Sequence, residues 1–334
     1  MNIAELGEFG LINLIGETIG KSLSGGKNSG QLICGIGDDA AAWQMQAAVQ
    51  MATVDSLIQG VHFTFDTISW EELGWKSLAV NLSDIAAMGG QARYAMVSLS
   101  LPGETEVSEV LSFYRGMLDL AEKTGVALVG GDTCRSPLVT ISVTVIGDAA
   151  EGDNMLRRSG AKPGDLVAVT GYLGSAAAGL LMLQENLKLD AGLASYIGEA
   201  FRRPCPRLAE GRLLLDLGAS AAIDISDGLV IDLGHIAGMS RVGTRIEVER
   251  VPIDPRVRES FGKKALSLAL SGGEDYELLF TASHDTISRL KMAVALPVTV
   301  VGEIISEGVG LVSVVDGRGK PLSLPGTGWE HFTA

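Results

Sequence analysis

The stretch SWEELGWKSLAVNLSDIAAMGG, residues 69–90, decides the fold because it reads as one complete helix. Ser69 followed three residues later by Glu72 forms a capping box, which is the sequence signature of a helix start. Apolar residues recur along it at helical spacing, and two glycines end it. The pattern therefore predicts a helix that carries Asp84 in its last turns.

Strands and helices alternate on both sides of this helix. Residues 48–54 before it and 95–101 after it have the apolar and β-branched character of strands. A polar, glycine-rich segment at 148–165 then separates this unit from a second one built in the same way. The sequence of 334 residues predicts an α/β (α+β) protein of two domains, residues 1–150 and 151–334.

Composition and charge exclude several classes of protein. The chain is 46% hydrophobic and 20% charged, as globular proteins are. Its 26 Lys and Arg against 40 Asp and Glu give a net charge of −14, which repels nucleic acids. There is no apolar run long enough to cross a membrane, and Glu5 and Glu8 stand where a secretory signal would be basic. We expect no nucleic-acid or membrane partner and a cytoplasmic location.

Two glycine-containing segments imitate nucleotide-binding motifs. GETIGKS (16–22) fails the spacing of a phosphate-binding loop because Ile15 stands where the first glycine must lie, so ordinary loop residues are expected there. GIGDDA (35–40) matches the dinucleotide fingerprint, which keeps a nicotinamide oxidoreductase as an alternative. However, Asp38 and Asp39 would stand where a pyrophosphate needs bare N–H groups, and paired acids suit a cation better.

Six acidic segments share one form, a short apolar run followed by small residues and an acid. They are GIGDD (Asp38, Asp39), TVDS (Asp55), NLSD (Asp84), GGD (Asp132), DISD (Asp224, Asp227) and GGED (Glu274, Asp275). One such segment is weak evidence, because an Asp next to Gly is commonly a turn residue or a helix cap. Most of these acids fall at predicted strand ends, and gathered carboxylates repel one another unless cations lie between them. Oxygen ligands without a His or Cys cluster predict Mg²⁺, which could in turn hold phosphates.

These segments, in this order, resemble the thiamine-monophosphate kinase family, part of the PurM-like superfamily that includes aminoimidazole ribonucleotide synthetase. The likeness covers nearly the whole chain and is carried by GIGDDAA (35–41), VDSLIQGVHF (54–63), SLAVNLSDIAAMG (77–89), GGDT (130–133), RSGAKPGD (158–165), IDISDGLVIDLGHI (223–236) and LSGGEDYEL (270–278). It implies a two-domain PurM-like architecture. The N-terminal domain would bind ATP and Mg²⁺ and pair its sheet with that of a second copy in a homodimer, and the C-terminal α/β domain would close the nucleotide cleft.

The reaction that the resemblance implies is direct, Mg²⁺-assisted transfer of the γ-phosphoryl group of ATP to thiamine monophosphate, with no covalent intermediate. The acceptor phosphate is already an anionic nucleophile, so positioning and metal ions suffice and no strong general base is needed. Another ATP-using member of the superfamily, the nicotinamide oxidoreductase and a non-catalytic metal-binding module remain as alternatives.

The resemblance also implies a role for individual residues. The magnesium ligands would be Asp39, Thr53, Val54, Asp55, Asp84, Asp132, Asp224 and Asp227. The contacts to ATP would be made by Tyr114, Gly131, Asp132, Arg158 and Ser226. The substrate would be bound by His62, Glu274 and Trp329, and the residues expected to be catalytic are Asp84, Asp132 and Arg158. Two positions depart from the family: Val54 stands where Thr is common and offers only its main-chain oxygen, and Trp329 stands where Tyr often occurs.

Overall fold

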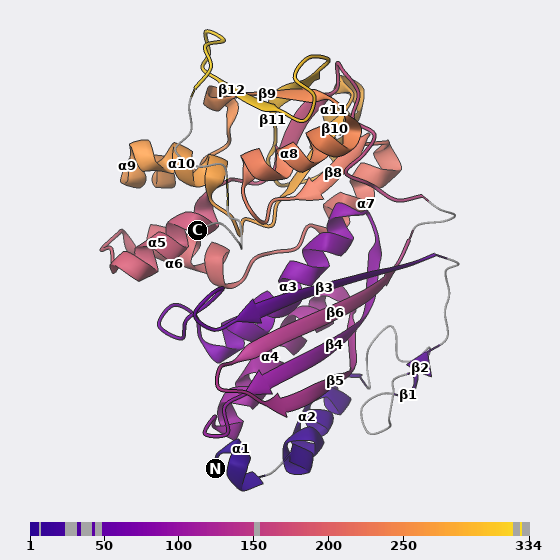
Figure 1. Ribbon diagram of the computed structural model, residues 1–334, viewed down its shortest axis with the longest axis vertical. Helices are drawn as coiled ribbons and strands as arrows, with labels where there is room; N and C mark the ends of the chain where they lie inside the picture. Colours follow the sequence, from indigo (N-terminus) through magenta and orange to yellow (C-terminus); the bar gives the residue numbers. More distant parts are fainter. Residues whose placement is uncertain are drawn as a thin grey trace. The chain divides into compact units, whose positions relative to one another are not determined.

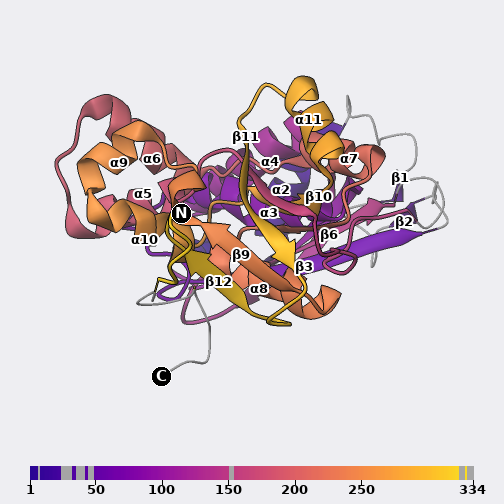
Figure 2. The same cartoon turned by 90° about the horizontal axis from the view of Figure 1, so that it is seen from above.

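The computed structural model describes residues 1–6, 8–23, 32–34, 42–43, 49–149, 154–322 and 328. The chain divides into two compact units, each with its own sheet (Figures 1 and 2). The first unit comprises Met1–Ile85 and Gly90–Asp153, and the second comprises Ala86–Gly89 and Asn154–Ala334. The predicted α/β (α+β) fold is confirmed. No helix among the described residues is long and apolar enough to cross a membrane.

The first unit is built on a four-stranded sheet in the order β3-β6-β4-β5. The strands are β3 (Gln50–Ile58), β4 (Gln91–Leu101), β5 (Ala127–Arg135) and β6 (Thr140–Asp148). Within this sheet, β4 and β5 pair in parallel and the other pairs are antiparallel. The helices are α1 (Ile3–Leu6), α2 (Glu8–Leu23), α3 (Trp70–Ala87) and α4 (Val107–Thr124), and the short strands β1 (Leu32–Cys34) and β2 (Ala42–Trp43) pair separately. Helices α3 and α4 lie on one face of the sheet (Figures 1 and 2).

Helix α3 begins as the sequence predicts. The N–H of Ser69 donates to Oε2 of Glu72 over 2.8 Å, and the N–H of Glu72 donates to Oγ of Ser69 over 3.3 Å. The apolar side chains Leu73, Leu78 and Leu82 are completely buried. Their burial holds the helix against the sheet, since removing apolar area from water is the main stabilising contribution.

The other face of the sheet is polar and partly exposed. Ser56, Ser142, Ser98 and Asp132 lie in register across the four strands and form one row on this face. Val54, on the same face of β3, is 61% exposed. The alternate residues of these strands, such as Val143, point to the opposite face and are buried against the helices.

The second unit holds a six-stranded sheet in the order β12-β9-β11-β7-β10-β8. Its strands are β7 (Leu166–Thr170), β8 (Ala221–Asp224), β9 (Gly243–Glu247), β10 (Leu278–Ala282), β11 (Val298–Ile305) and β12 (Val312–Val315). All pairs are antiparallel except β12 with β9. Helix α8 (Leu229–Ser240) packs on this sheet, whereas α7 (Leu208–Leu217) and α11 (His284–Ala293) pack together. A helical layer contains α5 (Ser175–Glu185), α6 (Ala191–Arg202), α9 (Pro255–Phe261) and α10 (Lys263–Ser271), and the 3-10 turn η1 (Val248–Arg250) follows β9.

Two expectations about local structure are wrong. Strands β3 and β5 run further than predicted, so Asp55 and Asp132 lie within strands and not at their ends. The residues Lys21 and Ser22 of the GETIGKS segment belong to helix α2 and not to a loop.

Candidate functional site

Strand β3 and helix α3 are joined by a short side-chain hydrogen bond. The hydroxyl of Thr53 donates to Oδ2 of Asp84 over 2.5 Å. Thr53 lies in the middle of β3 and Asp84 in the last turn of α3, and both are half-buried. A hydroxyl and a carboxylate are thus held together, and oxygen ligands of this kind are those that Mg²⁺ prefers.

A second bond between the same two elements involves a residue that sequence reasoning missed. The completely buried Asn81 accepts a hydrogen bond at Oδ1 from the backbone N–H of Asp55 over 3.1 Å. Its Nδ2 donates to the carbonyl of Ser77 over 3.0 Å, which fixes the orientation of the amide. Asn81 lies in the quoted segment NLSD, but a buried amide on a helix has no sequence pattern of its own.

The turn after β3 positions His62. The N–H of Ile58 donates to Nδ1 of His62 over 3.0 Å, while the N–H of His62 donates to the carbonyl of Ile58 over 2.9 Å. Because Nδ1 accepts, the neutral ring carries its proton on Nε2. The imidazole is therefore held in one orientation and one tautomer.

Gly131 and Asp132 lie at the far edge of the same sheet. A Cβ at Gly131 would lie 2.0 Å from the carbonyl oxygen of Val97 on β4, so this position requires glycine. Strands β3 and β5 are the two edges of the sheet and lie three strand spacings apart, about 14 Å. Within one chain the structure therefore does not bring Asp132 together with Thr53 and Asp84.

Tyr114 lies inside the first unit. Its side chain is 4% exposed, and its ring packs edge-on against Phe113 with centroids 5.3 Å apart. Burial raises the pKa of the Tyr114 phenol above its ordinary value. Its predicted contact with ATP stays a prediction.

In the second unit, two of the predicted motifs lie side by side. The N–H of Glu274 donates to the carbonyl of Ser226 over 2.8 Å, and the N–H of Tyr276 donates to the carbonyl of Ile225 over 2.9 Å. These bonds continue the antiparallel β8–β10 ladder beyond its last residue pair. The predicted ATP residue Ser226 and the predicted substrate residue Glu274 are thereby on adjacent segments.

The predicted metal ligands of this unit flank Ser226. Asp224 is the last residue of β8 and is 4% exposed, whereas Asp227 is half-buried in the turn that leads to α8. A further acid, Asp232, holds this turn, because its Oδ2 accepts the N–H groups of Asp227 over 3.1 Å and Gly228 over 3.0 Å. Burial raises the pKa of Asp232 to about 7, and its proximity to Asp227 adds to the rise. Sequence reasoning missed Asp232, although an acid four residues after a Ser-Asp-Gly turn is a recognisable signal.

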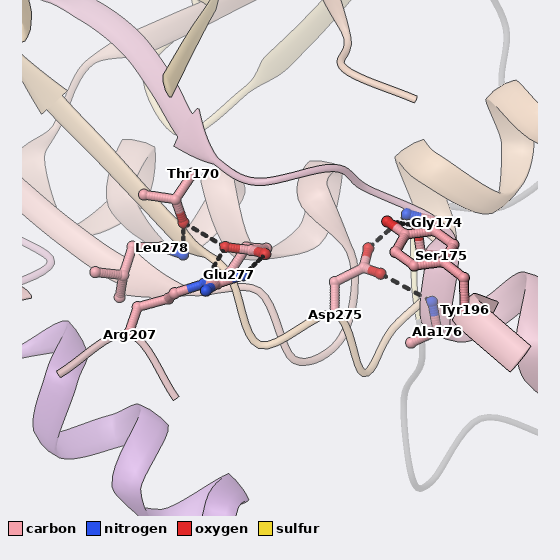
Figure 3. A network of polar contacts seen from close by, with 9 residues as sticks. All are labelled: Thr170, Gly174, Ser175, Ala176, Tyr196, Arg207, Asp275, Glu277 and Leu278. Carbon is pink, nitrogen blue, oxygen red and sulfur yellow. Dashed lines mark hydrogen bonds and ion pairs between the residues drawn. The ribbon is translucent and has the colours of Figure 1, made fainter. Parts of the chain in front are cut away.

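The segment that carries Glu274 is anchored by the two acids that follow it (Figure 3). Asp275 accepts the N–H of Gly174 at Oδ2 over 2.6 Å and the N–H of Ala176 at Oδ1 over 3.2 Å. Asp275 appeared among the acidic segments expected to gather around a cation, but its carboxylate caps the first turn of α5. Burial raises the pKa of Asp275 to about 7, against the effect of these N–H groups.

Glu277 makes a buried ion pair (Figure 3). Its Oε2 accepts from Nε of Arg207 over 2.7 Å and from the hydroxyl of Thr170 over 2.6 Å, while its Oε1 lies 2.5 Å from Nη2 of Arg207. Burial acts to lower the pKa of Arg207, but the hydrogen bonds that it donates to Glu277 and the charge of Glu277 raise this pKa overall. The pair ties the start of α7 to the strand end at Thr170.

Arg158 is exposed just after the first unit. Its carbonyl accepts from the hydroxyl of Ser240, which in turn accepts the N–H groups of Gly160 and Ala161, each over 3.1 Å. The backbone around Arg158 is therefore fixed to the end of α8, while the residue as a whole is exposed to solvent.

The remaining predicted residues lie outside the described part of the chain. These are Asp39, with the whole GIGDDA segment, and Trp329. Among the described residues, no group of three or more His, Cys, Asp or Glu side chains is close enough to hold a metal ion. The chemistry of the donors nevertheless fits a hard cation, since every assigned ligand is an oxygen.

Comparison with known proteins gives a consistent result. Residues 37–149 match the AIR synthase related protein N-terminal domain, and residues 162–318 match its C-terminal domain. The thiamine-monophosphate kinase of Escherichia coli K12 is 41% identical over 304 residues, which cover 89% of this chain and 91% of that protein.

Two solved structures are similar over most of their length. The crystal structure of the thiamine-monophosphate kinase of Stenotrophomonas maltophilia K279a has a TM-score of 0.81 and 39% identity, covering 92% of this chain and 96% of the other. The structure described as AaThiL complexed with AMPPCP and TMP has a TM-score of 0.77 and 36% identity, covering 99% of both chains. On the domains it contains and the relatives it matches, the chain belongs to the thiamine-monophosphate kinase family of the AIR synthase related proteins.

Proposed function

We propose that this chain transfers the γ-phosphoryl group of ATP to the phosphate of thiamine monophosphate, giving thiamine diphosphate and ADP. The observation that carries the proposal is the likeness over 99% of the chain to a protein solved with AMPPCP and TMP. A phosphate oxygen of the acceptor attacks the γ-phosphorus, and the bond from that phosphorus to the β-phosphate oxygen breaks. The acceptor is already anionic, so no residue has to remove a proton.

The proposed binding roles fall on residues of both units. Ser226 and Arg158 in the second unit, with Gly131, Asp132 and Tyr114 in the first, would bind ATP. His62, Glu274 and Trp329 would bind thiamine monophosphate. This assignment is supported by the bonds that place Glu274 next to Ser226 and by the fixed imidazole of His62.

Magnesium is part of the proposal. Its ligands would be Asp39, Thr53, the main chain of Val54, Asp55, Asp84, Asp132, Asp224 and Asp227. Bound magnesium would offset the charge of the phosphates and help to align them. The contact between Thr53 and Asp84 supports this role, because it keeps two oxygen ligands together before any ion arrives.

We further propose a homodimer that pairs the exposed faces of the two N-terminal sheets. The polar row that ends in Asp132 and the exposed Val54 support this interface, since a second copy could bring its own Asp132 to the edge formed by β3. The cytoplasmic location expected from the sequence also remains a proposal.

The test of the reaction is formation of thiamine diphosphate from thiamine monophosphate, ATP and Mg²⁺, followed by chromatography. Parallel reactions omit Mg²⁺ or replace the acceptor with free thiamine. We expect product only with the monophosphate and the metal. Folded protein that forms no thiamine diphosphate under these conditions would overturn the proposal and favour another ATP-using member of the superfamily.

A further inference from the structure

The segment that carries Glu274 has an unusual backbone. Glu274 has φ +70° and Tyr276 has φ +48°, so two residues with side chains adopt the left-handed region within three positions. Such conformations are unfavourable for residues with a Cβ and persist only where neighbouring contacts impose them. Two sets of hydrogen bonds hold this segment.

On one side, backbone hydrogen bonds hold the segment. The N–H groups of Glu274 and Tyr276 donate to the carbonyls of Ser226 and Ile225. On the other side, the holding contact is made by the side chain between them, since Asp275 accepts the N–H groups of Gly174 and Ala176 over 2.6 and 3.2 Å (Figure 3). Two charge-assisted bonds to a helix N-terminus are stronger than ordinary hydrogen bonds and hold the carboxylate in one place.

The N-terminus of α5, which Asp275 contacts, is itself held by its neighbours. A Cβ at Gly174 would lie 2.7 Å from the backbone nitrogen of Ala269, so this turn is packed directly against α10. The hydroxyl of Ser175 lies 3.2 Å from that of Tyr196 on α6 (Figure 3). Asp275 is thus connected to a rigid part of the second unit, and Glu274 is the adjacent residue.

We propose that Asp275 is a positioning residue, which fixes the backbone of Glu274 for binding of thiamine monophosphate. The inference rests on the proposed function, because it takes Glu274 as a substrate residue. Loss of the carboxylate would release one side of the strained segment, whereas Ser226 would stay in place in the turn between β8 and α8. Binding of the acceptor should therefore suffer more than binding of ATP.

The test compares Asp275→Asn with a matched control, Asp190→Asn. Asp190 also accepts two N–H groups at a helix start, those of Gly192 and Leu193 over 2.9 and 3.2 Å, but it lies at α6, outside every predicted motif. We expect Asp275→Asn to raise the KM for thiamine monophosphate about tenfold, with kcat and the KM for ATP changed less than about twofold. Asp190→Asn should leave all three constants unchanged.

Several outcomes would overturn the inference. An unchanged acceptor KM in folded Asp275→Asn contradicts it, as does an equal rise for acceptor and ATP. If Asp275→Asn does not fold, Asp275→Ser keeps one acceptor oxygen and is measured in its place. Glu274→Gln separates the two proposals: if it leaves the acceptor KM unchanged, the substrate role of Glu274 is wrong, and if it alone raises that KM, only the role of Asp275 is wrong.

Discussion

The hydroxyl of Thr53 lies 2.5 Å from Oδ2 of Asp84 and donates to it, so an edge strand and a helix of the first unit present two oxygen ligands together. Neither residue is needed to fill the apolar core, which is built from neighbours such as Leu82 and Ile85. A half-buried carboxylate in this position contributes little to packing. We therefore expect the role of Asp84 to be chemical.

The first prediction concerns Asp84. Asp84→Asn removes the charge but keeps the shape, so we expect kcat to fall by about 100-fold or more while the melting temperature changes by only a few degrees. Thr53→Ala removes only the hydroxyl and should cost about tenfold. Turnover and thermal unfolding are measured on the same samples. Asp119→Asn, an exposed acid of α4, is the control, and an equal loss in that variant would contradict the assignment.

The pair of Arg207 and Glu277 gives a prediction about stability. Breaking a buried ion pair leaves an uncompensated charge, so Glu277→Gln should lower the free energy of unfolding by about 3 kcal/mol. Asp285→Asn breaks the exposed contact of Asp285 with Arg289, 3.9 Å apart on α11, and should cost less than about 0.5 kcal/mol. Urea unfolding measures both. Equal losses in the two variants would mean that Glu277 does not stabilise the fold as a buried partner.

The sequence predicts the elements that have strong local signals. The capping box at Ser69 and the periodicity after it predict α3 to within a few residues, because both signals depend only on neighbours along the chain. Helices α6 and α9 are not predicted, although each begins with a recognisable signal. An Asp is the N-cap of α6, and Asp254 precedes Pro255 at the start of α9. Sheet order depends on distant pairings, so the position of Asp132 on the opposite edge from Asp55 is absent from the sequence pattern.

Dependence on distant contacts also explains why the sequence pattern groups some of the acids incorrectly. Asp275 and Glu274 are adjacent in the sequence, and the sequence pattern places both in the same acidic segment, GGED. In the structure, Asp275 accepts backbone N–H groups from a segment about a hundred positions away in the chain. No local pattern distinguishes an acid that caps a distant helix from one that binds a cation.

A third prediction uses the contact between the two motif segments. A Cβ at Gly273 would lie 2.4 Å from the carbonyl oxygen of Ser226, so Gly273→Ala must push the segments apart. We expect the KM for both substrates to rise by about tenfold. Gly238→Ala is the matched control, because its added methyl has no described neighbour within 4 Å apart from adjacent residues and the backbone of its own helix, and alanine favours helix α8. Steady-state kinetics compare the two variants. Wild-type constants for Gly273→Ala would contradict the close approach of Gly273 to Ser226.

The pKa of Asp275 predicts how stability depends on pH. An unfolded Asp titrates near pH 3.9, whereas Asp275 in the folded protein has a pKa of about 7, raised by burial and by the nearby Glu277. Between these values the folded state binds more protons than the unfolded state, so the free energy of unfolding should fall as the pH rises from about 4 to about 7. Glu277, which is paired with Arg207, and the phenol of Tyr196 are titratable groups that interact with Asp275.

Asp275→Asn tests this sign directly. The variant should lose part of the fall in stability between pH 4 and 7, while Asp190→Asn keeps it. Asp232, whose pKa burial also raises to about 7, adds a fall of the same sign, so the slope decreases without vanishing. Chemical unfolding at several pH values gives the slope, and an identical slope in wild type and Asp275→Asn contradicts the prediction.

The last prediction follows from the two edges of the N-terminal sheet. Asp55 and Asp132 are both expected to bind magnesium, yet β3 and β5 are separated by two other strands. If the partner in a homodimer supplies Asp132, then Asp55→Asn and Asp132→Asn are each inactive, but a mixed dimer regains one intact site. Co-expression of the two variants with different affinity tags should give mixed dimers with about half of the wild-type activity per dimer. If each site is built from one chain, the same mixed dimers stay inactive, since each subunit then carries one damaged site.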